Sequence, residues 1–362
     1  MASPTHDQDD AAQYREINDG QPSLSQAPAV IPTLNLPREE NDDNSAGDND
    51  SAIDIESYRS STYSITSSVA ERLEENGRTY HTYKEGKYML PNDETELNRL
   101  DLQHRMWEIT LDDQLHLAPL EPSPQRVLDI ATGSGIWAID FANKYPSAVV
   151  TGTDLSAVQP EYIPQNCEFQ IDDADDEWLF SRPFDYIHGR ACATCFKSHR
   201  EVFRKAYDNL RPGGYFEMQD LDLQTSEDGS IEGTTLTVIQ ENVHAALASA
   251  GMRWDNASNY RQWMEEVGFE DVTEIVYRWP SNPYWPSDPK EKTLGAWFLA
   301  QVGCGLLESV CTRIFMTKLG WSRERLNEFL TKAEKDLKDR KIKAYSPVYV
   351  VYGRKPRTLS AE

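Results

Sequence analysis

The chain has little of what membrane-spanning and secreted proteins use. Its 362 residues contain no run of about 18 apolar residues, so no transmembrane helix is expected. The start, MASPTHDQDD, lacks the basic residues and apolar stretch of a secretory signal. The five cysteines are unevenly spaced, which favours a reduced, intracellular protein over a disulfide framework. We therefore expect a cytoplasmic protein, with a nuclear location left open.

Positive charge is also scarce. The chain has 36 Lys and Arg residues against 60 Asp and Glu residues, which gives a net charge of −24. A duplex nucleic acid needs basic patches on its partner, so this composition argues against nucleic acid as a partner. We expect neither nucleic acid nor a membrane as partner, whereas a basic protein segment remains compatible with this charge.

Residues 1–70 are poor in large apolar side chains and contain 13 acidic and 3 basic residues. Such a segment cannot bury enough apolar area to offset its ordering entropy, so we expect a disordered acidic tail. It serves either as a solubilising leader or as a docking segment for a protein partner. The serine- and tyrosine-rich stretch at 57–64 would suit the second role.

What the chain does contain is a βαβ unit at 126–156. An apolar run at 127–130 is typical of a strand buried in a parallel sheet. Gly133 and Gly135 then permit a sharp turn, and the following ten residues have apolar side chains at helical spacing. A second apolar run leads to Asp154. This aspartate lies about 20 residues after the turn, the spacing of a carboxylate that binds ribose hydroxyls.

The residue before the turn separates two cofactor classes. The free amides at the start of the helix would suit a pyrophosphate. However, the strand ends in Asp129, and a carboxylate there repels a pyrophosphate and suits a cation. S-adenosylmethionine (SAM) carries an ammonium and a sulfonium and no phosphate. The sequence therefore favours SAM over NAD, although the same βαβ unit leaves a dinucleotide oxidoreductase as an alternative.

A third strand is predicted at 167–171, and it runs into Asp172 and Asp173. An acidic side chain at this strand end could accept a hydrogen bond from the adenine amino group. The alternative is a solvated acidic loop without a ligand. Further along the chain, a strand is predicted at 184–188 and a helix at 200–210, and a fifth strand begins after the helix.

The order of five segments resembles that of class I SAM-dependent methyltransferases: DIATGSG, TGTDLS, FQIDDADDEW, FDYIHGR and NLRPGGYFEMQD. Within this class the chain is similar to the fungal LaeA-like family. Further matches are ENGRTYHTYKEGKYMLPNDETELNRLD, GIWAIDFANKYP, WMEEVGFEDV and KIKAYSPVYVVYGRKP. The resemblance covers roughly residues 71–357.

The resemblance implies an α/β, Rossmann-like fold. Its sheet would have seven strands in the order 3-2-1-4-5-7-6, with strand seven antiparallel and helices on both faces. Residues 71–120 would form an N-terminal helical cap containing a helix from 93 to about 117. Residues 121–362 would form the methyltransferase domain, with lid insertions at about 222–262 and 280–340. Within the second insertion, a strongly charged helix at 323–340 is expected on the surface.

Cofactor contacts are expected from Tyr80, Asp129, Ala131, Gly133, Gly135, Asp154, Leu155, Asp172, Asp173 and Ala174. The resemblance places Tyr80 near the methionine end of SAM, and the alternative is that this tyrosine only anchors the cap. Ala131 stands where the class usually has its first loop glycine. Because alanine is small and suits the helical or β region, we expect it to be compatible with SAM binding.

The sequence does not identify a catalytic base. His188 and His81 are weak candidates, with His104 and His199 as further possibilities, and a base is needed only if the acceptor must lose a proton. Cys192 and Cys195, flanked by His188 and His199, are ligand types for zinc. The spacing crosses the expected exit of a strand, and no second C-x-x-C follows, so no metal is expected.

The leading hypothesis is a methyltransferase acting on a small-molecule acceptor, such as a fungal secondary metabolite. Aromatic residues in the second insertion could line an apolar acceptor pocket, or they could form the core of the lid. The alternative is a LaeA-like nuclear regulator of secondary metabolism that acts in a partner complex, with or without turnover. The acceptor, and whether oxygen, nitrogen or carbon is methylated, are left open.

Overall fold

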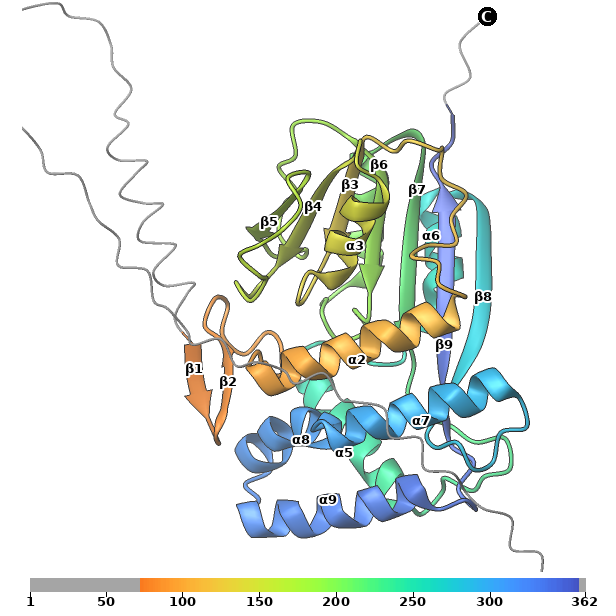
Figure 1. Ribbon diagram of the computed structural model, residues 1–362. Helices are drawn as coiled ribbons and strands as arrows, with labels where there is room; N and C mark the ends of the chain where they lie inside the picture. The colour runs from red at the N-terminus through yellow and green to blue at the C-terminus, as the bar shows by residue number, and fades with distance from the viewer. Residues whose placement is uncertain (1–71, 358–362) are drawn as a thin grey trace, which may run out of the picture. The chain divides into compact units, whose positions relative to one another are not determined.

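The computed structural model describes residues 72–357, and the predicted acidic tail lies outside the described residues. A seven-stranded sheet forms the upper part of Figure 1, in the order β5-β4-β3-β6-β7-β9-β8. The strands are β3 (Arg126–Ile130), β4 (Val149–Asp154), β5 (Cys167–Ile171), β6 (Phe184–Arg190), β7 (Leu210–Leu221), β8 (Glu270–Pro280) and β9 (Tyr345–Arg354). Strand β9 is antiparallel to both of its neighbours, whereas β5, β4, β3, β6 and β7 are parallel. The predicted strand order and the antiparallel seventh strand are confirmed.

Successive side chains of the buried strands pack alternately into two apolar cores, one on each face of the sheet. Val127 packs on one face with Trp137 of α3 (Ile136–Lys144). The next residue, Leu128, packs on the other face, where α4 (His199–Asn209) and α6 (Tyr260–Val267) lie. Successive residues of a strand point to opposite faces, so a run without polar alternation fits a sheet that is covered on both sides.

A helical lid lies beyond the carboxyl ends of the parallel strands, and α2 (Glu94–Thr110) lies between the sheet and the lid (Figure 1). The lid is built from two insertions, one between β7 and β8 and one between β8 and β9. Its helices are α5 (Thr235–Ser249), α7 (Pro289–Gly303), α8 (Leu306–Cys311), a π-helix (Thr312–Lys318) and α9 (Arg323–Lys338). Ala257–Asn259 form a short 3-10 turn before α6.

The lid has an apolar core of its own. Phe315 and Trp279 are fully buried in this core, and Trp279 also lines the cavity described below. Helix α9 is the charged helix that the sequence analysis expected on the surface, and this holds for only one side of the helix. One side of α9 is charged, but Leu326 and Leu330 on its other side are buried in the lid core.

Within the described residues, no single helix has the length and apolar character needed to cross a membrane. One bent pair, α7 with the α8 and π-helix segment, passes that test on length and composition alone.

Two local features differ from the sequence expectations. The chain begins with a hairpin of β1 (Arg72–Glu75) and β2 (Arg78–His81), which the sequence analysis did not predict. The hairpin turns at Asn76 and Gly77, both with positive φ, and an Asn-Gly pair is the usual signal for such a turn. Helix α2 ends at Thr110 rather than near 117, because the chain turns into the left-handed region soon afterwards.

Candidate cofactor and acceptor site

One cavity of about 300 Å³ runs from the carboxyl ends of the parallel strands into the lid. Its first part, here called the sheet half, is lined by Asp129, Ala131, Gly133, Asp154, Leu155, Asp172, Asp173 and Ala174. Its second part, the lid half, is lined by Leu236, Ile239, Val243, Leu247, Phe298, Leu306, Leu307, Val310 and Ile314. The cavity therefore joins a polar, acidic region to an apolar one.

The turn after β3 shapes the sheet half. Gly135 has a φ of 80°, and a Cβ atom added there would lie 2.4 Å from the Phe169 ring, so only glycine fits. Ala131 has a φ of 51°, in the left-handed region. The expectation that Ala131 adopts a helical or β conformation was therefore wrong. An alanine in this conformation is strained by roughly 1–2 kcal/mol, which explains why a glycine is usual at this point.

Asp154, the last residue of the neighbouring strand β4, binds the backbone of the turn after β3. Its two oxygens accept hydrogen bonds from the backbone N–H groups of Gly133 and Ser156, each at 2.9 Å. Burial raises the pKa of Asp154 to about 6. Each carboxylate oxygen has a further lone pair, so both can still accept a bond from a hydroxyl group in the cavity.

Asp129 is held from two sides. The Thr132 hydroxyl donates to one oxygen, and Nδ1 of His188 lies 2.7 Å from the other. His188 is fully buried, and its ring stacks on Trp137 with a centroid distance of 3.7 Å. His188 does not line the cavity. The structure therefore places it behind Asp129, where it orients the carboxylate and is not in a position to act as a base.

Comparison with known proteins agrees with this geometry. A family described as a methyltransferase domain matches residues 102–274. Methyltransferase pytC of Aspergillus terreus is 34% identical over 300 residues, which cover 82% of this chain and 92% of that protein. The probable methyltransferase tdiE of Emericella nidulans is 34% identical over 302 residues, covering 81% and 92%. The protein-methionine methyltransferase laeA of Emericella nidulans is 32% identical over 299 residues, covering 81% and 79%.

The chain belongs to the LaeA-like methyltransferase family. It is a SAM-dependent methyltransferase of class I fold, as the sequence analysis predicted, and the oxidoreductase alternative falls away. The residues of the sheet half fit the cofactor, because a left-handed glycine turn faces carboxylates at the ends of three adjacent strands. SAM supplies a methyl group activated by its sulfonium. The methyltransferase also needs a methyl acceptor, which is either a small molecule or a protein.

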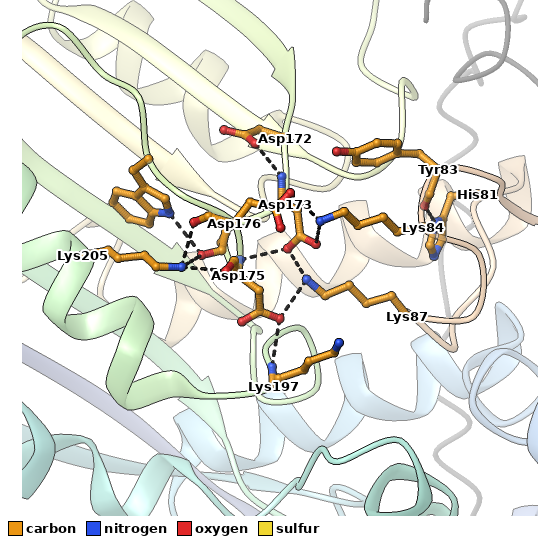
Figure 2. A network of polar contacts seen from close by, with 12 residues as sticks. His81, Tyr83, Lys84, Lys87, Asp172, Asp173, Asp175, Asp176, Lys197 and Lys205 are labelled. Carbon is orange, nitrogen blue, oxygen red and sulfur yellow. Dashed lines mark hydrogen bonds and ion pairs between the residues drawn. The ribbon is translucent and has the colours of Figure 1, made fainter.

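The acidic side chains after β5 have separate environments in this methyltransferase. Lys84 Nζ lies 2.7 Å from one oxygen of Asp173, and Lys87 binds the other oxygen (Figure 2). Although burial alone would raise it, these two lysines lower the pKa of Asp173. Asp172, by contrast, accepts one bond from the Asp173 backbone N–H, and burial raises its pKa. Of the two aspartates predicted to bind adenine, Asp172 therefore has fewer partners within the protein and is freer to accept a hydrogen bond.

The same contacts hold the segment between β2 and α2 (residues 82–93), here called the N-terminal segment, over the sheet half. Lys84 also contacts Asp176 at 2.5 Å, and Lys87 contacts Asp175 at 2.8 Å. Figure 2 shows both lysines extending from this segment toward the acidic loop. We call this set of ion pairs the lysine clasp. The sequence analysis did not identify it, since nothing in the pattern pairs these lysines with a loop almost 90 residues later.

Two predicted cofactor contacts do not line the cavity. Gly135 is packed against Phe169, as described above, and its role is to shape the turn. The Tyr80 ring lies 4.5 Å from the Arg313 guanidinium, and burial raises the pKa of Tyr80 to about 12. Tyr88 from the same segment lines the cavity instead.

His104 is the one histidine of the described chain that lines the cavity. His81 contacts the backbone oxygen of Tyr83 at 2.7 Å, and burial lowers its pKa. His199 contacts the backbone oxygen of Cys192 at 3.2 Å, and burial lowers its pKa to about 4. Neither His81 nor His199 therefore faces a ligand in the cavity.

The possible zinc ligands have other partners. Cys192 is buried, and its Sγ lies 3.3 Å from the Arg190 backbone oxygen. The nearby histidines contact Asp129 and the backbone of Cys192, as described above. A different set, His104, Glu108 and Asp140, brings potential ligand atoms within 4.8 Å of one another.

Proposed function

We propose that this methyltransferase transfers the methyl group of SAM to a small, apolar molecule of fungal secondary metabolism. The observation that carries the proposal is the lid half of the cavity, whose lining is aliphatic and aromatic and continuous with the sheet half. Small-molecule sites are concave and mostly apolar, with few polar groups. Relatives from Aspergillus fumigatus and Aspergillus flavus are named as secondary metabolism regulators, which supports the metabolic setting.

The walls of the cavity would support in-line methyl transfer by positioning the acceptor and by excluding water. Trp107 of α2 and Trp279 of β8 pack edge to face, with ring centroids 4.8 Å apart, and both line the cavity. The reaction requires the nucleophile to lie on the line of the bond that breaks, and water in the site would disturb that alignment. The apolar walls would hold the acceptor by its body and leave its nucleophilic atom facing the sheet half.

Incubation of the full-length protein with methyl-labelled SAM and a fungal metabolite extract tests the proposal. We expect the label in an organic-soluble product of low mass. The control is Asp154→Asn, which should give much less labelled product, because it is expected to bind the cofactor more weakly. Label confined to protein, with none in the low-mass fraction, would contradict a small-molecule acceptor.

A protein acceptor is the second candidate, and one comparison favours it. The relative laeA of Emericella nidulans is named as a protein-methionine methyltransferase. If this chain acts in the same way, the label should appear on methionine in the protein itself or in a co-purified partner. A chain that lacks residues 1–70 should then lose the partner in a pull-down at low salt, if the predicted tail is the docking segment.

A further inference from the structure

Helix α5 contributes five residues to the wall of the cavity, and one of them is polar. These residues recur at the spacing of a single helix face, and they are Leu236, Ile239, Gln240, Val243 and Leu247. Four of them are aliphatic, as expected for a helix face that is turned away from water. Gln240 is the exception, so a polar side chain stands in the apolar wall of the lid half.

The Nε2 group of Gln240 is buried and has no hydrogen-bond partner in the described part of the chain. Two other amides of the lid show the usual outcome. Nδ2 of Asn242, on the same helix, donates to the backbone oxygen of Val238 at 2.7 Å. Gln301 of α7 also lines the cavity, and its Oε1 accepts from Arg99 at 2.8 Å. Gln240 therefore differs from both, because its amide N–H groups remain unpaired.

An unpaired donor in a cavity wall indicates a partner that comes from outside the protein, because a buried N–H group without a hydrogen bond is costly. The last torsion of a glutamine is broad, so the amide can turn Nε2 toward the cavity without moving the helix. The aliphatic neighbours of Gln240 favour a neutral partner, since a charge loses its hydration in an apolar wall. A carbonyl oxygen fits both conditions, because it is neutral and accepts hydrogen bonds.

We propose that Gln240 is a specificity-determining residue, which donates a hydrogen bond from Nε2 to a carbonyl oxygen on the apolar body of the methyl acceptor. The inference rests on the proposed function, and it narrows the acceptor to apolar molecules that carry a carbonyl group. An acceptor of the same shape without this oxygen would leave the amide unpaired. A site built around such a hydrogen bond therefore discriminates against the analogue that lacks it.

Equilibrium dialysis with two small probes tests this contact without methyl transfer. The probes are 1-indanone and indane, which share a bicyclic skeleton and differ in one carbonyl group. The full-length protein is first saturated with S-adenosylhomocysteine, the demethylated form of SAM, so that the sheet half is filled. The ratio of the two affinities then reports on the carbonyl group alone, because the apolar skeleton is the same in both probes.

Gln240→Met is the test variant, since methionine keeps the length of the side chain and removes the amide. We expect it to lower the affinity for 1-indanone relative to indane by roughly tenfold. Gln262→Met makes the same exchange at an exposed position of α6 outside the cavity, and it should keep the wild-type ratio. The urea midpoint of Gln240→Met should stay the same or rise, because the variant removes an unpaired buried group.

Three results would overturn the proposal. An equal ratio in wild type and Gln240→Met would assign carbonyl recognition to another donor, such as the unpartnered Nε1 of Trp107. Wild-type protein that does not bind 1-indanone would show that the lid half does not accept such a molecule. A lower urea midpoint in Gln240→Met would mean that the amide supports the fold. If the extract gives no labelled small molecule, the proposed function fails, while the ratio of the probes still decides the role of Gln240.

Discussion

In the sheet half of the cavity, the groups that face a ligand are carboxylates and backbone atoms at strand ends. In the lid half they are aliphatic side chains and the Phe298 ring, on helices from the two insertions that flank β8. The first set is fixed by hydrogen bonds, such as those from Gly133 and Ser156 to Asp154. The second set is fixed by packing. The difference indicates that cofactor binding depends on individual atoms, whereas acceptor choice depends mainly on the shape of a volume.

The largest expected effect comes from removing a charge in the sheet half. Asp154→Asn should weaken S-adenosylhomocysteine by about 100-fold, because charge-assisted hydrogen bonds contribute about 1.5–3 kcal/mol each. Calorimetry at pH 8 measures this. The matched control is Asp113→Asn, an aspartate whose side chain is 77% exposed, and it should change nothing. Unchanged affinity in Asp154→Asn would mean that the cofactor is not bound at this strand end.

Filling the lid half should lower product formation and leave cofactor affinity unchanged. Val310→Phe places a larger side chain in the apolar part of the cavity, so labelled product from extract should fall by roughly tenfold or more as the acceptor volume is lost. Affinity for S-adenosylhomocysteine should stay the same. Val238→Phe, on the exposed side of α5, is the control and should behave as wild type. Loss of cofactor affinity in Val310→Phe would show that the two halves are not separable.

The sheet half should also respond to pH while the lid half does not. Burial raises the pKa of Asp154 to about 6 in the ligand-free protein. Hydroxyl donors favour the ionised form, so binding lowers this pKa, and affinity is lost as pH falls through it. S-adenosylhomocysteine should bind up to about tenfold more weakly per pH unit below 6 and reach a plateau above 7. The plot for Asp154→Asn should be nearly flat, and an equal slope in both proteins would exclude Asp154 as the titrating group.

The lysine clasp tests whether the sheet half needs its N-terminal cover. Lys87→Met leaves Asp173 with Lys84 alone, so the segment should open more often. We expect S-adenosylhomocysteine to dissociate several-fold faster, measured by stopped flow, with a smaller change in association rate. Lys290→Met removes an ion pair to the exposed Asp112 and serves as the control. An unchanged dissociation rate in Lys87→Met would mean that the segment does not cover the ligand.

The smallest effect concerns the strained turn. Ala131→Gly removes a Cβ from a residue with a φ of 51°, so it should stabilise the protein by roughly 0.5–1 kcal/mol after the entropy loss of glycine. Urea denaturation measures the free energy of unfolding. Ala138→Gly in α3 should change stability in the opposite direction, since glycine disfavours a helix interior. A destabilised Ala131→Gly would show that the alanine is not strained there.

The sheet half could be predicted from sequence because its signals are local. The strand, the glycine turn and Asp154 lie within 30 residues, and their roles follow from backbone geometry. The lysine clasp and the Arg190–His104 contact could not be predicted, because each joins residues almost 90 positions apart. The lid half was predicted only in outline. Apolar residues in a helical insertion are compatible with a core and with a pocket, and the structure shows that Phe298 belongs to both.

A crystal structure of the complex with S-adenosylhomocysteine tests the central claim most directly. The account predicts the ribose hydroxyls on the Asp154 carboxylate and the sulfur facing the lid half. Adenosine seated among the aliphatic residues of the lid half, or an Asp154 carboxylate turned away from the ligand, would contradict it.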